Sequence, residues 1–383
     1  MNAEAASGIP TVPNGRWLEQ LEELGPVFAE RAAAHDKDAR FVAENFTDLK
    51  KRRFFSFGVP AELGGGGASH SELCGVLRQL ARYCGSTALT ASMHMHLIAA
   101  NVWKYRRDQP GEKVLRKVAQ EELVLVSTGG RDWLSSSGEM TKAQGGYRVN
   151  ARKAFSSGCE YGDVLVTSAR LEGPSRGAQV LHFSLPLSTE GIELQNDWFT
   201  LGMRGTGSRT VALDGVFVPD EAVVLARPAD VWHPVWAVVA GVALPLIMAV
   251  YVGVAEQAAE LALSLARHKR ASDELAYLAG ELENELTVAR LALDGMISLA
   301  NDYRFEPTQE LASEMLVRKT ICTGSVMAVA GKALELAGGV GFFQGVGLER
   351  LVRDLHAAQF HPLPAKQQHR FTGRLALGLE AVG

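Results

Sequence analysis

The spacing of hydrophobic positions changes twice along the chain. From residue 16 to about 120, apolar residues recur every three or four positions, as in "WLEQLEELGPVFAERAAAHD", which predicts amphipathic helices. From about 121 the chain breaks into short β-branched runs such as "LVLVST" and "DVLVTSARL", divided by Gly, Pro and Asp, which predicts strands. The helical spacing returns after Pro228 and lasts to the end. The order predicts an α+β fold with three domains: a helical one (1–120), a β one (121–227) and a helical one (228–383).

One segment has the length and composition of a membrane span. Residues 235–255 carry no charge, but they are rich in Ala and Gly, contain Pro245 and run directly into "EQAAELALSLARHKR". We therefore expect a buried helix of a large bundle and no membrane partner.

Bulk composition removes several classes of function. The 383 residues carry a net charge of −4, which gives no electrostatic case for nucleic acid as a partner. The four cysteines stand alone, with no Cys/His cluster, so neither a metal site nor a disulfide framework is expected. The N-terminus lacks the basic and apolar regions of a secretory signal, and the expected location is cytoplasmic.

Two stretches carry side chains that suit a planar heterocycle. In "LVSTGGRDW", Ser127 and Thr128 end a strand before two glycines, where hydroxyls and free N–H groups can bond the polar edge of a ring. Ordinary turn chemistry explains the same residues. In "NARKAFSSG", Phe155 is followed by hydroxyls, including Ser157, at a strand end, where an aromatic and a hydroxyl can flank a ring.

Two further stretches have alternative interpretations. In "WFTLGMRGTGSRTVALDGVFVP", Arg204, Thr206 and Ser208 alternate, so on an extended chain they share one face that can grip an anionic group; a surface hairpin is the alternative. The glycines of "LAGGVGFFQGVG" are not spaced as GxGxxG, and a helix precedes them where a dinucleotide fingerprint needs a strand. A helix C-cap followed by a glycine loop is the better interpretation.

Three motifs in order give the chain a family resemblance. "GYRVNARKAFSSG", "LGMRGTGSRTVALDGVFVP" and "GGVGFFQGVGLERLVRD" resemble the acyl-CoA dehydrogenase superfamily, and the resemblance covers about residues 16 to 380. It implies an N-terminal helical domain, a central β-barrel domain and a C-terminal four-helix bundle. It also implies a flavin held between sheet and bundle, and a homotetramer or a dimer of that type.

The resemblance assigns flavin contacts to particular residues. Ser127 and Thr128 would meet the pyrimidine edge of the ring, and Phe155 and Ser157 would lie beside the isoalloxazine. The pyrophosphate and ADP contacts of FAD, the latter made across a subunit boundary, would come from Lys269, Arg270, Gly338, Gly339 and Gly341. Glu335 stands where the family usually has glutamine, and a carboxylate is unfavourable near a pyrophosphate. The cofactor is therefore expected to be FAD or FMN.

The chain departs from the dehydrogenases at their catalytic base. Removal of an α-proton from an acyl thioester needs a positioned carboxylate. In "QFHPLPAKQQ" the family's glutamate is replaced by Pro362, and the alternative position, in "GVALPLIMAVYVG", contains no acid. The chain therefore resembles the flavin-dependent monooxygenase branch, which includes dibenzothiophene monooxygenase. There reduced flavin and O2 form a C4a-hydroperoxide.

In that branch two histidines and a serine surround the reacting part of the flavin. The matching residues here are His361, His96 and Ser157. An imidazole can donate to the distal peroxide oxygen, and a hydroxyl near N5 can hold the intermediate. His361 as a helix cap and Ser157 as a backbone partner are the alternatives. His94 lies two residues from His96 on a helix, so the two face different ways, and His96 is preferred at the flavin.

The predicted enzyme is a two-component monooxygenase. A separate NAD(P)H:flavin reductase is implied as a partner, because the chain has no second nucleotide fold. The substrate would be small and either aromatic or nucleophilic at S or N, with contacts expected from His94, Trp133, Arg204 and Phe360. The alternatives are an acyl-CoA dehydrogenase or oxidase, with His361 or Glu160 as an atypical base and Arg204 placing the CoA, and a non-catalytic scaffold.

Overall fold

The computed structural model describes residues 16–128, 130, 132, 134–173 and 177–382. The N-terminal part is helical, as predicted, and α3 shows why a helix begins where it does. Ser69 Oγ accepts the N–H of Glu72 at 3.2 Å while the Glu72 carboxylate accepts the N–H of Ser69 at 2.7 Å, a reciprocal cap. The helices are α1 (Arg16–Lys37), α2 (Ala43–Lys51), α3 (His70–Tyr83), α4 (Gly85–Tyr105) and α5 (Glu112–Glu121), with a short 3-10 turn η1 at Ala61–Leu63.

The middle of the chain forms an eight-stranded sheet. Its strands are β1 (Leu125–Ser127), β2 (Glu139–Ala143), β3 (Gly146–Lys153), β4 (Val164–Leu171), β5 (Gln179–Pro186), β6 (Ile192–Leu194), β7 (Val211–Pro219) and β8 (Val223–Pro228). The pairing path is β6-β7-β3-β2-β4-β5-β8, and β1 pairs with β4 in parallel. Within the described residues β6 and β8 are not paired with each other, so the predicted β domain is an open sheet rather than a closed barrel.

The C-terminal part is again helical, as the spacing predicts. Its long helices are α6 (Val235–Arg267), α7 (Asp273–Ala300) and α8 (Gln309–Ala337), which pack against one another. The shorter α9 (Leu348–Leu355) packs on α6 and α8 and completes the four-helix arrangement. Further short elements are η2 (Arg204–Thr206), η3 (Asp220–Ala222), η4 (Asn301–Tyr303), η5 (Gly338–Phe342), η6 (Gln344–Val346), η7 (His356–Phe360) and α10 (Ala365–Ala376).

The uncharged helix α6 is the centre of the helical core. Two described helical segments, Val235–Arg267 and Gln309–Phe342, are long and apolar enough to cross a membrane by length and composition. In α6, however, 94% of the most apolar 18-residue window is buried inside the protein, by α3, α4, α7 and α8. Its apolar surface is therefore already covered by the chain's own helices.

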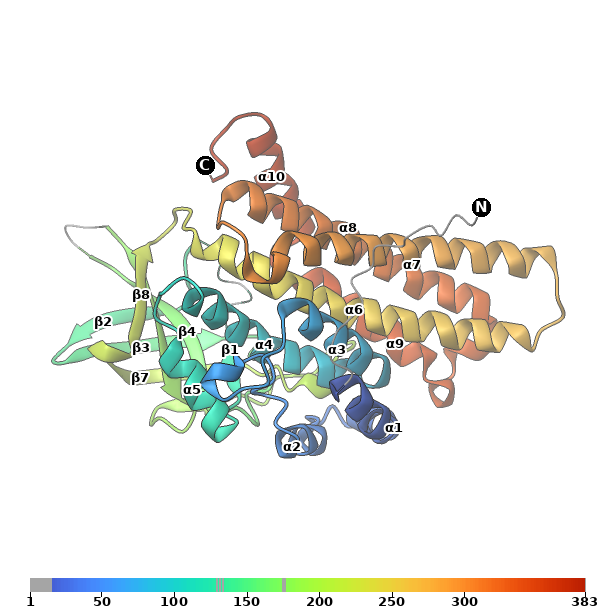
Figure 1. The fold of residues 1–383 in the computed structure, drawn as a ribbon, viewed down its shortest axis with the longest axis horizontal. Helices are drawn as coiled ribbons and strands as arrows, with labels where there is room; N and C mark the ends of the chain where they lie inside the picture. The colour runs from blue at the N-terminus through green and yellow to red at the C-terminus, as the bar shows by residue number, and fades with distance from the viewer. Residues whose placement is uncertain (1–15, 129, 131, 133, 174–176, 383) are drawn as a thin grey trace.

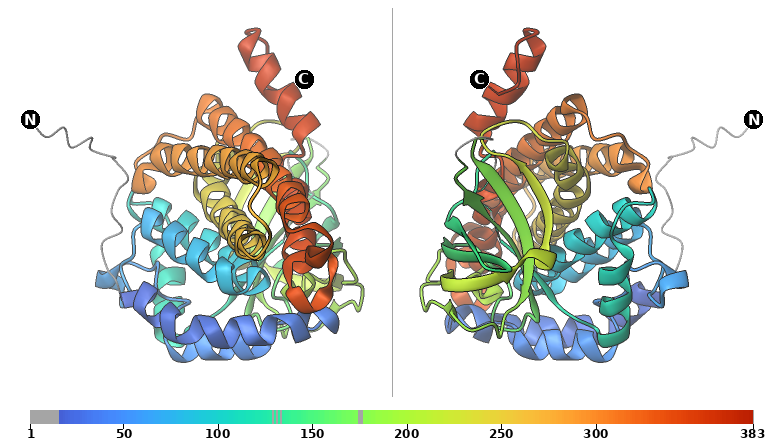
Figure 2. Two further views of the ribbon diagram at one scale, coloured as in Figure 1. Left: turned by 90° about the vertical axis from the view of Figure 1, so that its right-hand side faces the viewer. Right: turned by 90° about the vertical axis from the view of Figure 1, so that its left-hand side faces the viewer.

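The sheet stands at one end of the long helices. Figure 1 shows it at the left of the view, with α6, α7 and α8 extending away to the right, and the right-hand view of Figure 2 shows it in front of the helices. The N- and C-terminal helices share one hydrophobic core, whereas the sheet has a second core of its own. We propose domain boundaries at these changes of structure, giving 1–120, 121–227 and 228–383.

Candidate functional site

A cavity of about 600 Å³ lies where the sheet meets α4 and α6. Pockets of this size suit a small organic ligand or cofactor. Its walls are mostly apolar side chains of α4 and α6, such as Leu97 and Ile247. The predicted site residues that line it are His96, Ser127, Thr128, Phe155, Ser157, Phe360 and His361. Segments far apart in the sequence are therefore brought to one space.

The end of β1 supplies the first polar edge of the cavity. Pairing of β1 with β4 brings Thr128 beside Thr167, and the Thr128 N–H donates to the carbonyl of Val166 at 3.2 Å. The Thr128 hydroxyl donates to the Thr167 hydroxyl at 2.6 Å. The side chains of Ser127, Thr128 and Thr167 all line the cavity and form a row of hydroxyls at one end of the sheet.

Two aromatic rings form the next part of the wall. Phe155 follows β3 in the left-handed backbone region (φ 60°), which turns its ring out of the sheet, and the side chain is 42% exposed. Its ring packs edge-on against Trp198, with the centroids 5.9 Å apart at 82°. An aromatic pair beside hydroxyls fits the flank of a planar ring, so this wall fits a flavin.

Ser157 begins a line of three hydroxyl groups along the cavity wall. Its Oγ lies 2.7 Å from Ser208 Oγ, which in turn lies 2.7 Å from Thr206 Oγ1. The Thr206 hydroxyl donates to the carbonyl of Met203 at 2.8 Å. Among the described residues, the Ser157 hydroxyl has no hydrogen bond to backbone, which was the alternative considered for it. Its partner is another side-chain hydroxyl.

His361 lies in the segment after α9 and is held on two sides. Its Nε2 lies 2.8 Å from the hydroxyl of Tyr251 on α6. The ammonium group of Lys319 on α8 donates to the backbone carbonyls of His361 and Leu363 at 2.7 and 3.1 Å. Burial, assisted by the nearby Lys319 charge and by His96, lowers the pKa of His361 to about 3. The imidazole is therefore neutral at physiological pH.

His96 comes from α4 and faces the same cavity. Burial lowers its pKa to about 4, so it too is neutral at physiological pH. His96 is also one of the groups that lower the pKa of His361. The cavity thus contains two neutral imidazoles, from α4 and from the segment after α9.

The structure does not bring His94 to the cavity, which corrects its assignment as a substrate contact. Its Nε2 donates to the carbonyl of Phe55 at 2.7 Å, and its Nδ1 accepts the N–H of Leu125 at 3.0 Å. The side chain is 1% exposed. Because both ring nitrogens bind backbone, His94 joins the N-terminal helices to the start of β1 and has no group left for a ligand.

Arg204 also lies outside the cavity lining, whereas Thr206 and Ser208 line it. The prediction that the three share a face assumed an extended chain. Instead Arg204 begins the 3-10 turn η2, and Met203 and Gly207 adopt left-handed backbone with φ of 52° and 53°. These turns remove the alternation on which the prediction depended. Trp133, the other predicted substrate contact near this region, is outside the described residues.

The residues assigned to the pyrophosphate and ADP lie away from the cavity of their own chain. Figure 1 shows the connection between α6 and α7, which carries Lys269 and Arg270, at the end of the molecule opposite the sheet. Lys269 Nζ donates to the carbonyl of Leu336 at 2.8 Å, beside the glycine loop of Gly338, Gly339 and Gly341. A cation at the C-terminus of α8 is favourable there on its own account. A contact with the cofactor of a neighbouring subunit stays a prediction.

A buried ion pair supports the cavity wall next to the sheet. Lys153 Nζ lies 2.8 Å from the carboxylate of Asp132, and both side chains are buried, at 1% and 6% exposure. Lys153 also donates to Ser136 Oγ at 2.9 Å and to the Ser137 carbonyl at 2.5 Å. The ammonium group holds the pKa of Asp132 below its usual value against the opposing effect of burial. Although Asp132 lines the cavity, its charge is therefore already neutralised.

The sheet also contributes a histidine to the cavity that the sequence analysis did not identify. His182 on β5 lines the cavity, and its Nε2 accepts from Nε of the buried Arg227 on β8 at 3.0 Å. Burial, with the Arg227 charge, lowers the pKa of His182 to about 3. A guanidinium can only donate, so the neutral ring must carry its proton on Nδ1. The register of β5 against β8 creates this pair, and sequence spacing gives no sign of it.

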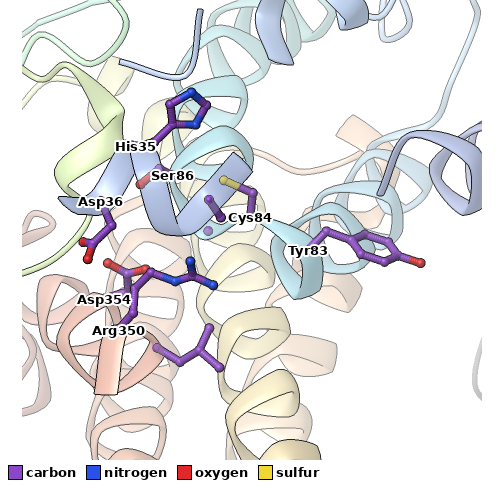
Figure 3. Close-up of a pocket in the computed structure, with 10 residues that line it drawn as sticks. His35, Asp36, Tyr83, Cys84, Ser86, Arg350 and Asp354 are labelled. Carbon is purple, nitrogen blue, oxygen red and sulfur yellow. The ribbon is translucent and has the colours of Figure 1, made fainter. Parts of the chain in front are cut away.

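A much smaller pocket lies between α1 and α9. Its volume is about 10 Å³, and Figure 3 shows the carboxylates of Asp36 and Asp354 beside Arg350 at its rim. Asp354 accepts the backbone N–H of Met203, and burial raises the pKa of Asp354 to about 6. The pocket is too small for a ligand larger than water. The carboxylate of Asp354 instead fixes the turn at Met203, which leads to Thr206 and Ser208 in the wall of the large cavity.

Comparisons with known proteins agree with this geometry. Residues 22–122 match the family described as "Acyl-CoA dehydrogenase, N-terminal domain", and residues 246–364 match "Acyl-CoA dehydrogenase, C-terminal domain". Together the two matches cover more than half of the chain.

Individual relatives include both dehydrogenase and monooxygenase names. A putative acyl-CoA dehydrogenase, YdbM of Bacillus subtilis (strain 168), is 26% identical, over 91% of this chain and 93% of its own. The oxygenase subunit HsaA of a flavin-dependent monooxygenase of Rhodococcus jostii (strain RHA1) is also 26% identical, over 90% and 93%. Among solved structures, KijD3 in complex with FMN and a dTDP-amino-keto sugar superimposes with a TM-score of 0.88 at 25% identity, over 97% of this chain and 96% of its own.

Proposed function

From the premise that the chain belongs to the acyl-CoA dehydrogenase family, we propose that it is the oxygenase component of a two-component flavin-dependent monooxygenase. It would use reduced flavin and O2 to oxygenate a small organic substrate. The similarity to HsaA, itself an oxygenase subunit, supports this branch of the family, and the chemistry of the cavity decides against the equally similar dehydrogenase relative.

One observation carries the proposal: the cavity offers no free carboxylate among its described lining residues. Asp132 is the only acidic side chain there, and Lys153 neutralises it. Glu160, considered as an atypical base, is not a lining residue and lies 3.1 Å from the guanidinium of Arg209. His361, with a pKa of about 3, is a weak base. Abstraction of an α-proton therefore lacks a suitable group, which argues against acyl-CoA dehydrogenation.

The polar groups that are present suit oxygen chemistry better. His96 and His361 are neutral imidazoles, and a neutral imidazole can donate a hydrogen bond to a peroxide oxygen without supplying a charge. The phenol of Tyr251 orients His361 through their 2.8 Å hydrogen bond. Apolar side chains of α4 and α6 line the same space and would keep water away from a bound flavin.

Flavin is the cofactor that the cavity fits. Ser127, Thr128, Phe155 and Ser157 would hold the ring, with Trp198 packed against Phe155. The bound reduced flavin supplies the electrons that activate O2. The FMN in the KijD3 complex supports FMN, and the distance of Lys269 and Arg270 from the cavity agrees with a cofactor that needs no ADP contact within one chain.

The partners follow from the chemistry. Reduced flavin must come from a separate NAD(P)H:flavin reductase, because no described part of the chain forms a second nucleotide-binding fold. We propose a homotetramer, as is typical of the family, a cytoplasmic location, and a substrate that is aromatic or carries a nucleophilic S or N. The cavity beside Trp236, Leu244 and Phe360 suits the apolar part of such a molecule.

Acyl-CoA dehydrogenation is the second candidate, because YdbM is an equally similar relative. One anaerobic experiment separates the two. The purified chain is loaded with oxidised flavin and mixed with a series of acyl-CoA thioesters, and separately with reduced flavin before exposure to O2. The proposal expects no bleaching by any thioester and formation of a flavin–oxygen adduct band on oxygenation. Bleaching by an acyl-CoA without any such band would instead establish the dehydrogenase.

A further inference from the structure

The hydroxyl line behind Ser157 has a fixed direction. Ser157, Ser208 and Thr206 are joined by contacts of 2.7 Å, and Thr206 Oγ1 lies 2.8 Å from the carbonyl of Met203. Each hydroxyl has one proton to donate, and a carbonyl has none. The line therefore ends at a group that can only accept.

The Met203 peptide is itself fixed from both sides. Its N–H is bound by the buried carboxylate of Asp354, and its carbonyl accepts the Thr206 N–H at 3.1 Å and Trp198 Nε1 at 3.3 Å. Thr206 is fully buried and Ser208 is 4% exposed, so neither hydroxyl can turn to solvent for another partner. All three residues line the cavity, and Ser157 is the end of the line that is farthest, bond by bond, from the Met203 carbonyl.

Counting protons along the line settles which way each bond points. Thr206 gives its proton to Met203, so in the contact with Ser208 it must accept, and Ser208 must donate. Ser208 then has no proton left for Ser157, and Ser157 must donate to Ser208. The reverse order would leave two oxygens, on Thr206 and Met203, facing each other at 2.8 Å without a proton between them, which is repulsive.

We propose that this line makes Ser157 an obligate acceptor toward the cavity, and that the site thereby selects the reduced flavin over the oxidised one. This inference rests on the proposed function. Atom N5 of a reduced flavin carries a hydrogen and donates, whereas N5 of an oxidised flavin has only a lone pair. Reduced flavin therefore gains a hydrogen bond to Ser157, and oxidised flavin meets lone pair against lone pair unless the whole line reverses.

Selection of this kind fits a component that receives reduced flavin and must give oxidised flavin back. Ser208 and Thr206 are positioning residues in this arrangement, since their hydrogen bonds set the direction of the Ser157 proton. A tenfold preference for the reduced form corresponds to about 1.4 kcal/mol, and to about 30 mV in the two-electron potential of the bound flavin.

The test measures the affinities of the two redox states under anaerobic conditions. Kd is determined for oxidised FMN, for reduced FMN and for oxidised 5-deaza-FMN, in which a C–H replaces the N5 lone pair. The unaltered chain is expected to bind reduced FMN at least about tenfold more tightly than oxidised FMN. It is also expected to bind 5-deaza-FMN more tightly than oxidised FMN, because the lone-pair contact is absent.

Two variants release the line by different routes. Ser208→Ala frees the proton of Ser157, and Thr206→Val frees that of Ser208, so in both Ser157 can donate to oxidised N5. The ratio of the two Kd values should fall about fivefold or more in each, mainly through tighter binding of oxidised FMN. The matched control is Thr90→Val, which removes a buried hydroxyl that touches only the backbone carbonyl of Thr206, at 3.4 Å; its ratio should equal that of the unaltered chain.

The outcomes separate this inference from the proposed function. Flavin binding with an unchanged ratio in both variants would overturn the inference and leave the proposed function standing. So would 5-deaza-FMN binding no more tightly than oxidised FMN to the unaltered chain, a result that depends on no variant folding. A chain that binds neither redox state of FMN or FAD would overturn the proposed function and the inference together.

Discussion

Replacing Tyr251 with phenylalanine is the sharpest test of how the site holds His361. The substitution keeps the ring and removes one hydroxyl, whose partner is His361 Nε2 at 2.8 Å. Tyr251 is fully buried, and the two rings also pack edge-on with centroids 5.3 Å apart, a contact that phenylalanine preserves. The change therefore removes a hydrogen bond and little else.

The expected magnitude follows from that geometry. An intramolecular hydrogen bond contributes about 1 kcal/mol net, and an imidazole nitrogen left without a partner in a buried site adds to the loss. We expect Tyr251→Phe to cost about 1–2 kcal/mol of unfolding free energy. In the proposed reaction a loosened His361 should also raise the rate of peroxide release about tenfold, since each 1.4 kcal/mol of lost stabilisation is a factor of ten.

A second buried tyrosine provides the control. The hydroxyl of Tyr303 has no hydrogen-bond partner among the described residues, and its side chain is 1% exposed. Tyr303→Phe therefore removes a buried hydroxyl without removing a bond and is expected to be neutral or slightly stabilising. The comparison of the two variants isolates the hydrogen bond from the effect of deleting an oxygen.

The assays are urea unfolding and stopped-flow detection of hydrogen peroxide after reduced flavin meets O2. A shift of the unfolding midpoint with an unchanged slope reports stability alone. Combining Tyr251→Phe with His361→Ala should add little beyond His361→Ala, because the bond is already lost. If Tyr251→Phe matched Tyr303→Phe in both assays, the hydrogen bond would not be what positions His361.

Three further predictions concern ionisation and the buried ion pair. With pKa values of about 3 for His361 and about 4 for His96, the imidazole NMR signals of these two residues should not titrate between pH 5 and 8; a midpoint near 6.5 for either ring would contradict the burial argument. His94 has its pKa lowered by burial to about 4, so the native state binds fewer protons than the unfolded one below pH 6.5. The contribution of neutral His94 to the free energy of unfolding is thus fully present above pH 6.5 and falls by up to about 3 kcal/mol toward pH 4. Tm measured from pH 4 to 8 would check this, and His94→Gln should give a flatter profile. Lys153→Met should lower the free energy of unfolding by about 3 kcal/mol or more, because it leaves Asp132 unpaired. The double variant with Asp132→Asn should recover part of that loss. Equal unfolding midpoints for the single and the double variant would contradict this prediction.

The sequence could predict those site residues that lie together in one short motif. Ser127, Phe155 and Ser157 stand at strand ends, where the change from period two to a turn signal marks exposure of the next side chains. The histidine after α9 stands out because proline replaces the expected acid beside it. For the pair on α4, spacing establishes only that His94 and His96 point in different directions. The preference for His96 at the cofactor agrees with the cavity, whereas a ligand role for His94 required a free ring nitrogen that it does not have.

Partners that meet across the fold could not be predicted in the same way. Tyr251 is one polar group in a run of apolar residues, and only the packing of α6 against the segment after α9 gives its hydroxyl a partner. Lys153 and Asp132 are 21 residues apart and join through the fold of the sheet. The prediction for Arg204 assumed an extended chain. That assumption fails because Met203 and Gly207 adopt left-handed backbone. Local signals predict elements, whereas these contacts depend on tertiary packing.

Lys319 grips the loop after α9 by the main-chain oxygens of residues 361 and 363, and makes no hydrogen bond to the side chain at 361. Any amino acid at position 361 would present the same carbonyl to that ammonium group. The side chain at position 361 can thus change while the loop stays anchored. Because Lys319 binds main-chain oxygens, a substitution at position 361 can change the chemistry of the cavity without changing the position of the loop.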